Sequence, residues 1–311
     1  DYHERTRIVF WRQLLGFVGG VGFMAAPMIL MTGTTAFTPE VMRGIAIFVI
    51  VALPVLVLLM CRTVPEPSRH VMSRKIRFGD LWRALRSNPP LVYFLVTQIL
   101  FGLSTGAVST LFVIYASQYL GLADRIPHIA LPMTLAMAAG MPLWLWVMRR
   151  VDKHRVWAAG AIGMILTLLS VLWIPPGGLM PMIGATTCLG LFIGLSSIAL
   201  PSLLADIVDY DLWKNRKDRA AIFFSFQALV TKINQGVGGA IALAFAGLFG
   251  FTGKAVVEGT AVAGLKFAFV GWPCLLLAPM IVLAWRYPLD RRGQALLRNR
   301  LDRRVRMSAG A

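Results

Sequence analysis

Long apolar segments recur along the whole chain, and they limit what it can fold into more than any other feature of the sequence. Eight blocks of 19 to 31 residues are dominated by apolar side chains: 13–33, 43–61, 91–120, 128–148, 156–174, 180–205, 220–250 and 263–286. A helix needs about 20 such residues to cross the hydrocarbon core of a bilayer, whereas a transmembrane β-barrel shows alternating segments of about 10 residues. The sequence therefore predicts an all-α polytopic membrane protein with about eight transmembrane helices.

Charged residues are scarce and unevenly placed. Only 14% of the 311 residues are charged, against about 25% in a soluble domain. The net charge of +17 could suit nucleic acid, but its distribution points elsewhere. Of the 31 Lys and Arg residues, 26 lie in alternate loops and in the tail: 1–12, 62–90, 149–155, 207–219 and from 286 onward. The positive-inside rule predicts that these loops and the C-terminus are cytoplasmic, so the expected partner is a lipid bilayer and not nucleic acid.

The longest basic loop divides the chain. Six apolar blocks follow it, which is typical of the junction between the two six-helix halves of a secondary transporter. We therefore expect residues 1–62 to end an N-terminal half, 63–90 to form the central cytoplasmic loop, 91–287 to form the C-terminal half, and 288–311 to be a basic tail. The chain opens with DYHERTR, which has the character of a loop. We expect an N-terminally truncated sequence that retains two spans of the first half and lacks four.

Lys232 is the residue that most clearly indicates a functional site. It lies 13 residues past Arg219 in an apolar block, which places it about 20 Å into a hydrocarbon core about 30 Å thick. A charge at this depth indicates function by default and requires a partner. All 14 Asp and Glu residues lie in loops or at span ends, so no mid-membrane carboxylate of this chain can serve. The alternative is a lysine that reaches an interface or braces neighbouring helices.

Polar residues accompany Lys232 along one side of the same predicted helix. At 100° per residue they fall within a stripe about 100° wide, which Lys232 flanks: Gln227, Thr231, Asn234, Gln235 and Gly238. Amides and hydroxyls both donate and accept hydrogen bonds, as sugar hydroxyls do. The stripe therefore predicts the lining of a polar cavity. Hydrogen bonding between helices is the alternative.

Small residues mark two further spans. In the block 91–120, Gly102 and Gly106 lie beside a polar face formed by Gln98, Thr105 and Ser109. In the block 180–205, Gly190, Gly194 and Ser197 follow a similar spacing. Small residues allow membrane helices to approach closely, so we interpret both sets mainly as packing surfaces.

Three stretches of the sequence resemble one family. They are DYHERTRIVFWR (residues 1–12), MRRVDKHRVWAAG (148–160) and ALPSLLADIVDYDLWKNRKDRAAIFFSFQALVTKINQGVGGAIA (199–242). They resemble, respectively, the entry to the fifth span, the loop between spans eight and nine, and the signature of spans ten and eleven in the glycoside–pentoside–hexuronide:cation symporters of the major facilitator superfamily. The resemblance implies the fold of that superfamily, with this chain equivalent to spans 5–12 and two bundles around a central cavity that opens alternately to each side.

The resemblance also implies roles for single residues. Gln227 stands five residues before Lys232, the spacing at which a glutamine of the family contacts sugar. Arg12 matches an arginine near the sugar, and a positive-inside anchor is its alternative reading. With the polar stripe, the predicted substrate-binding residues are Arg12, Gln227, Thr231, Lys232, Asn234 and Gln235. Ser197 occupies the position of the family's aromatic platform, so the identity of the sugar stays open.

Acidic residues imply a coupling ion and a gate. In the resembled family, carboxylates of spans two and four bind the cation, so we expect Na⁺ or H⁺ as the coupling ion and its ligands in the missing N-terminal spans. Asp206, Asp209 and Arg219 match a cluster that closes the cytoplasmic side in that family, and we predict a gate there. Its basic members would come from the residues just downstream: Lys214, Arg216, Lys217 and Arg219. A solvated loop whose ion pairs contribute little is the alternative.

Motifs of enzymes are absent from the sequence. The four His residues lie in loops or at span edges without metal-ligand spacing, and there is no P-loop, HExxH motif or Rossmann glycine run. We therefore expect no enzyme and no cofactor. The predicted function is symport of a sugar and a cation by a monomeric protein of a bacterial inner membrane. Transport of another amphiphilic solute, such as a lysolipid or drug, and a non-transporting membrane sensor or scaffold are the alternatives.

Overall fold

The protein is a bundle of long membrane helices. A computed structural model describes residues 15–23, 39–63, 85–215, 219–251, 259–289 and 293–294. All regular structure in these residues is helical, and seven helical stretches are long and apolar enough to cross a membrane. This confirms the prediction of an all-α polytopic membrane protein. Of the first predicted block, 13–33, the structure describes only residues 15–23, which are helical.

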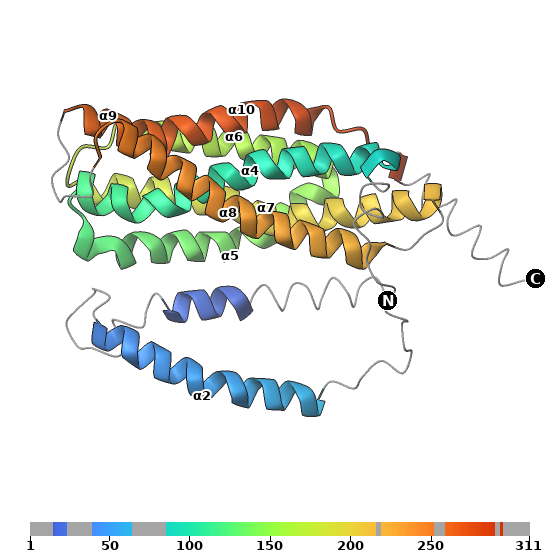
Figure 1. Cartoon of the computed structure of the whole chain (residues 1–311), viewed down its shortest axis with the longest axis horizontal. Coiled ribbons are helices and arrows are strands. Elements are labelled where there is room, and N and C mark those ends of the chain that lie inside the picture. Colours follow the sequence, from blue (N-terminus) through green and yellow to red (C-terminus); the bar gives the residue numbers. More distant parts are fainter. Residues whose placement is uncertain are drawn as a thin grey trace, which may run out of the picture.

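The helices follow the predicted blocks closely (Figure 1). A π-helical turn, Tyr115–Tyr119, extends α4, and another, Phe267–Gly271, joins α9 to α10. A short 3-10 turn, Ala123–Arg125, precedes α5. The helices are α2 (Pro39–Thr63), α4 (Pro89–Ile114), α5 (Ile126–Arg150), α6 (Lys153–Val171), α7 (Leu179–Asn215), α8 (Ala220–Leu248), α9 (Thr260–Lys266) and α10 (Trp272–Trp285).

The start of α4 is fixed by residues that the sequence placed at the end of the preceding loop. The Asn88 side chain accepts a hydrogen bond from the Leu91 amide at 3.2 Å, and Pro89 occupies the first position of the helix. A proline is suited to that position because its missing N–H would have no partner there. Asn88 is fully buried, and its amide also reaches the Ile207 carbonyl in α7 at 3.5 Å. This cap therefore joins two helices as well as starting one.

Helices α4 to α10 pack in a pattern of paired contacts. The most extensive contacts join α5 with α7 and α4 with α8, followed by α6 with α7, α10 with α4, and α10 with α6. Exchanging α4 with α7, α5 with α8, and α6 with α10 converts the α5–α7 pair into α4–α8 and the α6–α7 pair into α10–α4, and it leaves the α10–α6 pair unchanged. Two three-helix units related by a pseudo-two-fold axis produce such a pattern. Repeats of this inverted kind are typical of secondary transporters.

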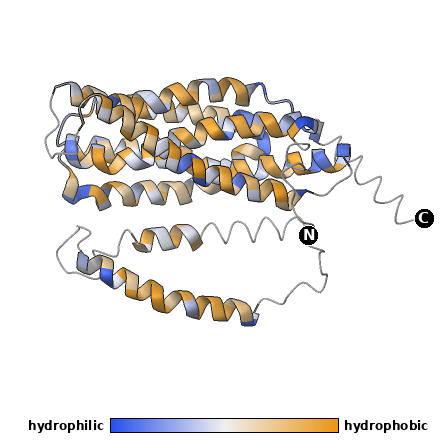
Figure 2. Ribbon diagram, viewed as in Figure 1, coloured by the Kyte–Doolittle hydropathy of each residue, from blue (hydrophilic) through white to orange (hydrophobic). Residues whose placement is uncertain are grey.

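Apolar residues cover the outside of the bundle, and hydrophilic residues gather at its ends (Figure 2). Exposed apolar side chains are costly in water but suit a lipid environment. Helix α2 carries the most apolar window of all, and none of that window is buried within the described residues. In Figure 1 it lies apart from the α4–α10 bundle. The apolar side chains of α2 are therefore available to lipid or to further protein.

Glycines allow two helix pairs to touch at their backbones. A Cβ added at Gly106 of α4 would lie 2.6 Å from the Gln235 carbonyl oxygen of α8, and one at Gly194 of α7 would lie 2.7 Å from the Met137 carbonyl oxygen of α5. Such approaches permit Cα–H···O contacts, each contributing about 0.5–1 kcal/mol. Similar restrictions hold at Gly102, Gly190 and Gly238. The interpretation of Gly102, Gly106, Gly190 and Gly194 as packing residues is confirmed, whereas Gly238, which the sequence placed on the polar stripe, also packs against α4.

The end of α7 differs from the prediction. The sequence placed a loop at 207–219, but α7 continues to Asn215. Its 37 residues span about 55 Å at 1.5 Å per residue, well beyond a hydrocarbon core of about 30 Å. The apolar block ends near residue 205 because the membrane ends there, and the helix continues into the polar layer. Asp209 therefore lies on a helix and not in a loop, and Asp206 lies within the helix and not at its end.

Candidate functional site

Helix α8 presents three different faces. One face packs on α4 and includes Asn234, of which only 5% is exposed. A second face is open and apolar, with Leu229 and Ile233 more than half exposed. Between them lies an open flank of small and polar residues: Ser225, Ala228, Lys232, Gln235 and Gly236. We call this group the polar flank of α8. An open polar surface midway along a membrane helix requires protein or water beside it, because lipid cannot satisfy its hydrogen bonds.

Lys232 lies near the middle of α8, where Figure 2 shows hydrophilic residues interrupting the apolar helix. Its side chain is exposed, and it forms no ion pair with any residue that the structure describes. The described carboxylates of the α4–α10 bundle lie near helix ends: Asp124, Asp152, Asp206, Asp209 and Asp211. The structure therefore brings no partner to Lys232 within its described part.

A glutamine from α4 bridges to the packed face of α8. The Gln98 side-chain amide donates to the Thr231 hydroxyl at 2.8 Å and to the Gln227 carbonyl at 3.2 Å. The Asn234 amide donates in turn to the Gln98 carbonyl at 3.4 Å. The Thr231 hydroxyl also donates to the Gln227 carbonyl one turn earlier, at 2.9 Å. Hydrogen bonding between helices, the alternative reading of the polar stripe, thus describes the contacts of Thr231 and Asn234.

The predicted stripe is consequently divided between two environments. Asn234 is buried against α4, while Gln227 and Thr231 are half-buried at the edge of the contact. Gln235 and Lys232 belong to the open polar flank. Of the three polar residues that the sequence singled out in span seven, Gln98 forms the hydrogen bonds to α8 that the structure describes, whereas Thr105 and Ser109 bond to carbonyls of their own helix. The sequence placed Gln98 on a polar face of its predicted helix, but periodicity alone could not predict that it pairs with Thr231.

A buried ion pair joins two helices at the basic end of the bundle. Lys153 Nζ at the start of α6 lies 2.7 Å from Asp206 Oδ2 in α7, and Asp206 is only 2% exposed. The sequence had grouped Asp206 with the bases that follow it, so this pairing is a correction. The cause is the continuation of α7: Asp206 points into the helix packing, toward an element 53 residues earlier. Asp209 lies half-buried about one turn farther along α7.

Arg219 approaches a different carboxylate from the one that was predicted. Its Nη1 atom lies 3.8 Å from Asp211 Oδ1, and both side chains are largely buried. Asp211 also accepts a hydrogen bond from Asn215 at 2.6 Å, and Asn215 contacts the Ser87 hydroxyl at 3.2 Å. Sequence reasoning missed Asp211. Its i, i+4 spacing to Asn215 is the signal that could have indicated it.

The residues after α10 return to this cluster. The Tyr287 ring lies 5.6 Å from the imidazole of His154, and both residues are buried. Burial raises the pKa of the Tyr287 hydroxyl, and the nearby Asp206 carboxylate raises it further, so the group stays neutral. The end of the membrane domain is thereby packed onto the same helices that hold the Lys153–Asp206 pair.

Other predicted positions lie elsewhere. Arg12, Arg216 and Lys217 lie outside the described residues. Ser197 is half-buried in α7. Among the residues that the structure describes, no three His, Cys, Asp or Glu side chains come together as a metal site.

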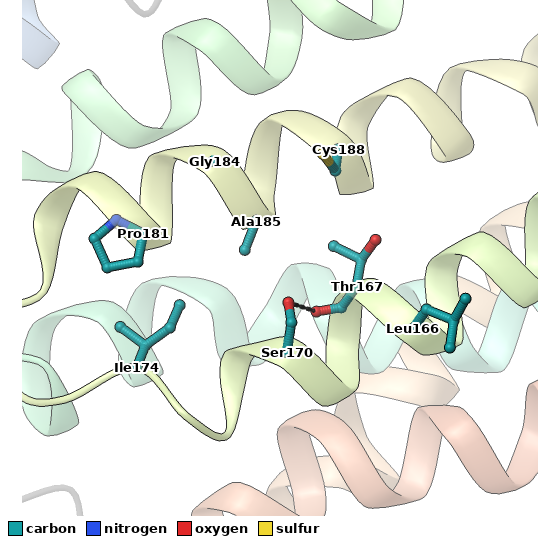
Figure 3. A pocket seen from close by; sticks show the side chains of 8 residues that line it. All are labelled: Leu166, Thr167, Ser170, Ile174, Pro181, Gly184, Ala185 and Cys188. Carbon is teal, nitrogen blue, oxygen red and sulfur yellow. Dashed lines mark hydrogen bonds between the residues drawn. The ribbon is translucent and has the colours of Figure 1, made fainter.

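A groove between α6 and α7 lies away from all of these residues (Figure 3). Its volume is about 410 Å³. The hydroxyl of Ser170 donates to the Thr167 carbonyl beside it, so this polar group is already satisfied. The groove is lined by Leu166, Thr167, Ser170, Ile174, Pro181, Gly184, Ala185 and Cys188. It contains none of the predicted site residues and does not extend to the polar flank of α8.

Comparison with known proteins agrees with this architecture. The sequence model of a family described as "MFS/sugar transport protein" matches residues 1–291. The isoprimeverose transporter of Lactiplantibacillus pentosus is 24% identical over 93% of this chain and 61% of its own length. A sodium-dependent lysophosphatidylcholine symporter of Danio rerio is 26% identical over 73% and 44%, and a glucuronide carrier homolog of Escherichia coli 23% identical over 73% and 48%. The chain thus spans about half to three fifths of these relatives, all of which are named as transporters.

Proposed function

Because this chain belongs to the family of MFS/sugar transport proteins, we propose that its gene product is a secondary active transporter. It couples the movement of a glycoside, pentoside or hexuronide to Na⁺ or H⁺ by alternating access. The observation that carries the proposal is the polar flank of α8. Lys232 and Gln235 stand open at mid-membrane depth, next to the half-buried Gln227 and Thr231. Arg12, at the start of the chain, is proposed to join them at the sugar.

The polar flank has the chemistry that a sugar site requires. Amide groups such as that of Gln235 both donate and accept, and an ammonium group supplies three donors. The lone charge of Lys232 is costly in a membrane unless a carboxylate or a polar ligand compensates for it. We propose that the compensating carboxylate also binds the coupling ion and comes from outside these 311 residues. Ion binding and the state of Lys232 would then be linked electrostatically.

The ion pairs at the basic end supply the second part of the mechanism. Asp206 with Lys153, and Asp211 with Arg219, join α6, α7 and the start of α8. Partly buried pairs of this kind can form in one conformation and separate in another. We propose that these residues, together with Asp209, act as the cytoplasmic gate.

Membrane placement follows from the charge distribution. We propose a monomer in a bacterial inner membrane with its C-terminus in the cytoplasm, and no nucleic-acid partner. Arg155 is suited to test this topology because its side chain is 53% exposed, whereas the neighbouring His154 is buried. A cysteine at position 155 should resist an impermeant thiol reagent added outside intact cells. Efficient labelling from outside would reverse the proposed orientation.

A lysolipid is the second candidate substrate, because a lysophosphatidylcholine symporter is among the relatives. Uptake assays distinguish the two candidate substrates. They use proteoliposomes that contain the complete gene product and an imposed Na⁺ or H⁺ gradient. Accumulation of a labelled glycoside, pentoside or hexuronide that depends on the ion supports the proposal. Accumulation of labelled lysophosphatidylcholine, with none of the sugars, would replace it with the second candidate. Accumulation of neither would favour a non-transporting membrane protein.

A further inference from the structure

Gln98 differs from the other polar residues of α4 in what its side chain does. Only 2% of it is exposed, and it lies one helical turn before Gly102, where α4 packs closely on α8. Its amide nitrogen serves two acceptors on α8 at once, the Thr231 hydroxyl and the Gln227 carbonyl. Thr231 and Asn234, its partners along the seam, are not otherwise linked to α4 by a hydrogen bond that the structure describes.

The contact fixes α8 at the level of Lys232. Thr231 is the residue directly before Lys232, and successive residues of a helix lie about 100° apart around its axis. Holding Thr231 against α4 therefore directs Lys232 about 100° away, onto the polar flank. A rotation of α8 by a similar angle, away from this contact, would point Lys232 in the direction that the exposed Leu229 and Ile233 now face.

Glycine packing brings the two helices together but supplies no polar contact between side chains that would fix this rotation. Gly102 and Gly106 permit a close approach, but their surfaces have no donors that could select one orientation of α8. The directional groups at this level are the amide of Gln98 and its acceptors. Within a membrane the apolar driving force between helices is weak, so hydrogen bonds and shape decide which faces meet.

We infer that Gln98 is a positioning residue, which sets the rotation of α8 and thereby holds Lys232 on the polar flank. Gln98 itself is buried and does not touch the solute. The inference rests on the proposed function only for the role of Lys232 in transport. The geometry that it asserts, a link between the Gln98 amide and the orientation of residue 232, can be measured without any substrate.

The test uses the complete gene product with Lys232→Cys as a reporter. Cys61 and Cys188 are exposed, so these two, Cys274 and any further cysteines of the complete gene product are first replaced by serine. The rate of modification by a small, charged methanethiosulfonate reagent then reports whether position 232 faces water or lipid. Gln98→Met keeps the shape and removes the donor of both hydrogen bonds to α8. It should lower this rate at least about fivefold, the effect of losing one buried hydrogen bond. Thr231→Val removes only one of the two bonds, so it should lower the rate by less than Gln98→Met. The rate of the double variant should not fall below that of Gln98→Met alone.

Ser104→Ala is the matched control, because Ser104 is also buried in α4 but its hydroxyl forms no hydrogen bond to α8 that the structure describes. In this variant, the modification rate at position 232 should stay within about twofold of the rate in the reporter alone. That change is smaller than the effect of losing one hydrogen bond. An unchanged rate in folded Gln98→Met protein would overturn the inference, and so would an equal fall in Ser104→Ala. If Gln98→Met does not fold, Thr231→Val alone decides in the same way. A shifted rate in a protein that accumulates no sugar would leave this inference standing and contradict only the proposed function.

Discussion

In α4–α8 and in α5–α7, two helices that run in the same direction touch at glycine. Gly106 lies against the carbonyl of Gln235 in the first pair, and Gly194 lies against the carbonyl of Met137 in the second. The distances that an added Cβ would meet are nearly equal, 2.6 and 2.7 Å. The pseudo-two-fold exchange of α4 with α7 and of α8 with α5 relates the two contacts. We call them the α4–α8 seam and the α5–α7 seam.

The side chains around the two seams differ. In the α4–α8 seam, Gln98, Thr231 and Asn234 form hydrogen bonds between side chains and backbone of both helices. In the α5–α7 seam, the polar link that the structure describes is a single one, from the Trp144 indole to the Leu191 carbonyl at 2.8 Å. Otherwise that contact involves apolar side chains such as those of Met133 and Phe192.

This difference separates two tasks that a helix seam can perform. Both seams provide close packing, so both should contribute similarly to stability. Directional hydrogen bonds add a defined rotation, which matters only where a helix carries a side chain that must point one way. Lys232 is such a side chain, and it lies on α8. The comparison therefore predicts that substitutions at the two seams affect stability alike but affect transport differently.

The largest effect should come from Lys232→Ala. In the proposed mechanism Lys232 pairs with a carboxylate from outside these 311 residues. Removing one partner of such a pair costs about 2–5 kcal/mol, so cation-driven accumulation should fall about 30-fold or more. Uptake into proteoliposomes with and without the ion gradient measures this effect. Lys254→Ala, at a position outside the described residues, removes the same charge and should transport normally. Wild-type uptake and ion dependence in Lys232→Ala protein would remove the polar flank from the transport mechanism.

The second prediction concerns the Lys153–Asp206 ion pair, which holds α7 beyond the α5–α7 seam. Lys153→Ala leaves Asp206 buried without its ammonium partner, and breaking a buried pair in this way destabilises by about 3 kcal/mol or more. The melting temperature of the purified protein in detergent should fall clearly. Arg155→Ala is the matched control, because Arg155 is 53% exposed and lies 3.4 Å from Asp152. Its loss should cost less than about 1 kcal/mol. Equal melting temperatures for the two variants would show that the Lys153–Asp206 pair contributes no more than a surface pair.

The third prediction compares the packing of the two seams directly. Gly106→Ala and Gly194→Ala each force a methyl group against a backbone carbonyl, and overpacking of this kind costs about 1–3 kcal/mol. Thermal unfolding should show similar losses for both. Gly236→Ala in α8 and Gly184→Ala in α7 are controls, because an added Cβ there meets nothing within 4 Å. They should be neutral or stabilising by up to about 1 kcal/mol through helix propensity. A loss at only one seam would contradict the equivalence of the two.

Much of this arrangement could be predicted from the sequence. Apolar blocks of membrane length located the spans, since composition directly reports the hydrocarbon layer. The glycine spacings of Gly102 with Gly106, and of Gly190 with Gly194, correctly indicated close packing. The end of α7 was missed because apolar composition marks the edge of the membrane and not the end of a helix. Ten residues of that helix, 206–215, lie beyond the predicted block.

The contacts of the candidate site were harder to predict. Periodicity placed Gln227, Thr231 and Asn234 on one stripe, but it could not tell that α4 covers this stripe while Lys232 stays open. That choice depends on which helix lies beside α8, a tertiary property. The partner of Asp206 was missed for the same reason, because Lys153 lies 53 residues away and nearer bases were available along the chain. Residue type thus predicted which groups need partners, and packing decided which partners they have.

The smallest effect is expected at the polar link of the α5–α7 seam. Trp144→Phe keeps the aromatic contact with Phe192 but removes the hydrogen bond to the Leu191 carbonyl. That carbonyl lies inside α7, where the helix supplies a donor, so the loss should be about 1 kcal/mol or less. Transport kinetics should stay at wild-type values, because this bond joins α5 to α7, whereas the polar flank lies on α8. A change in the KM for the solute, in protein of normal stability, would mean that the α5–α7 seam also orients the site, and the proposed division of tasks between the two seams would fail.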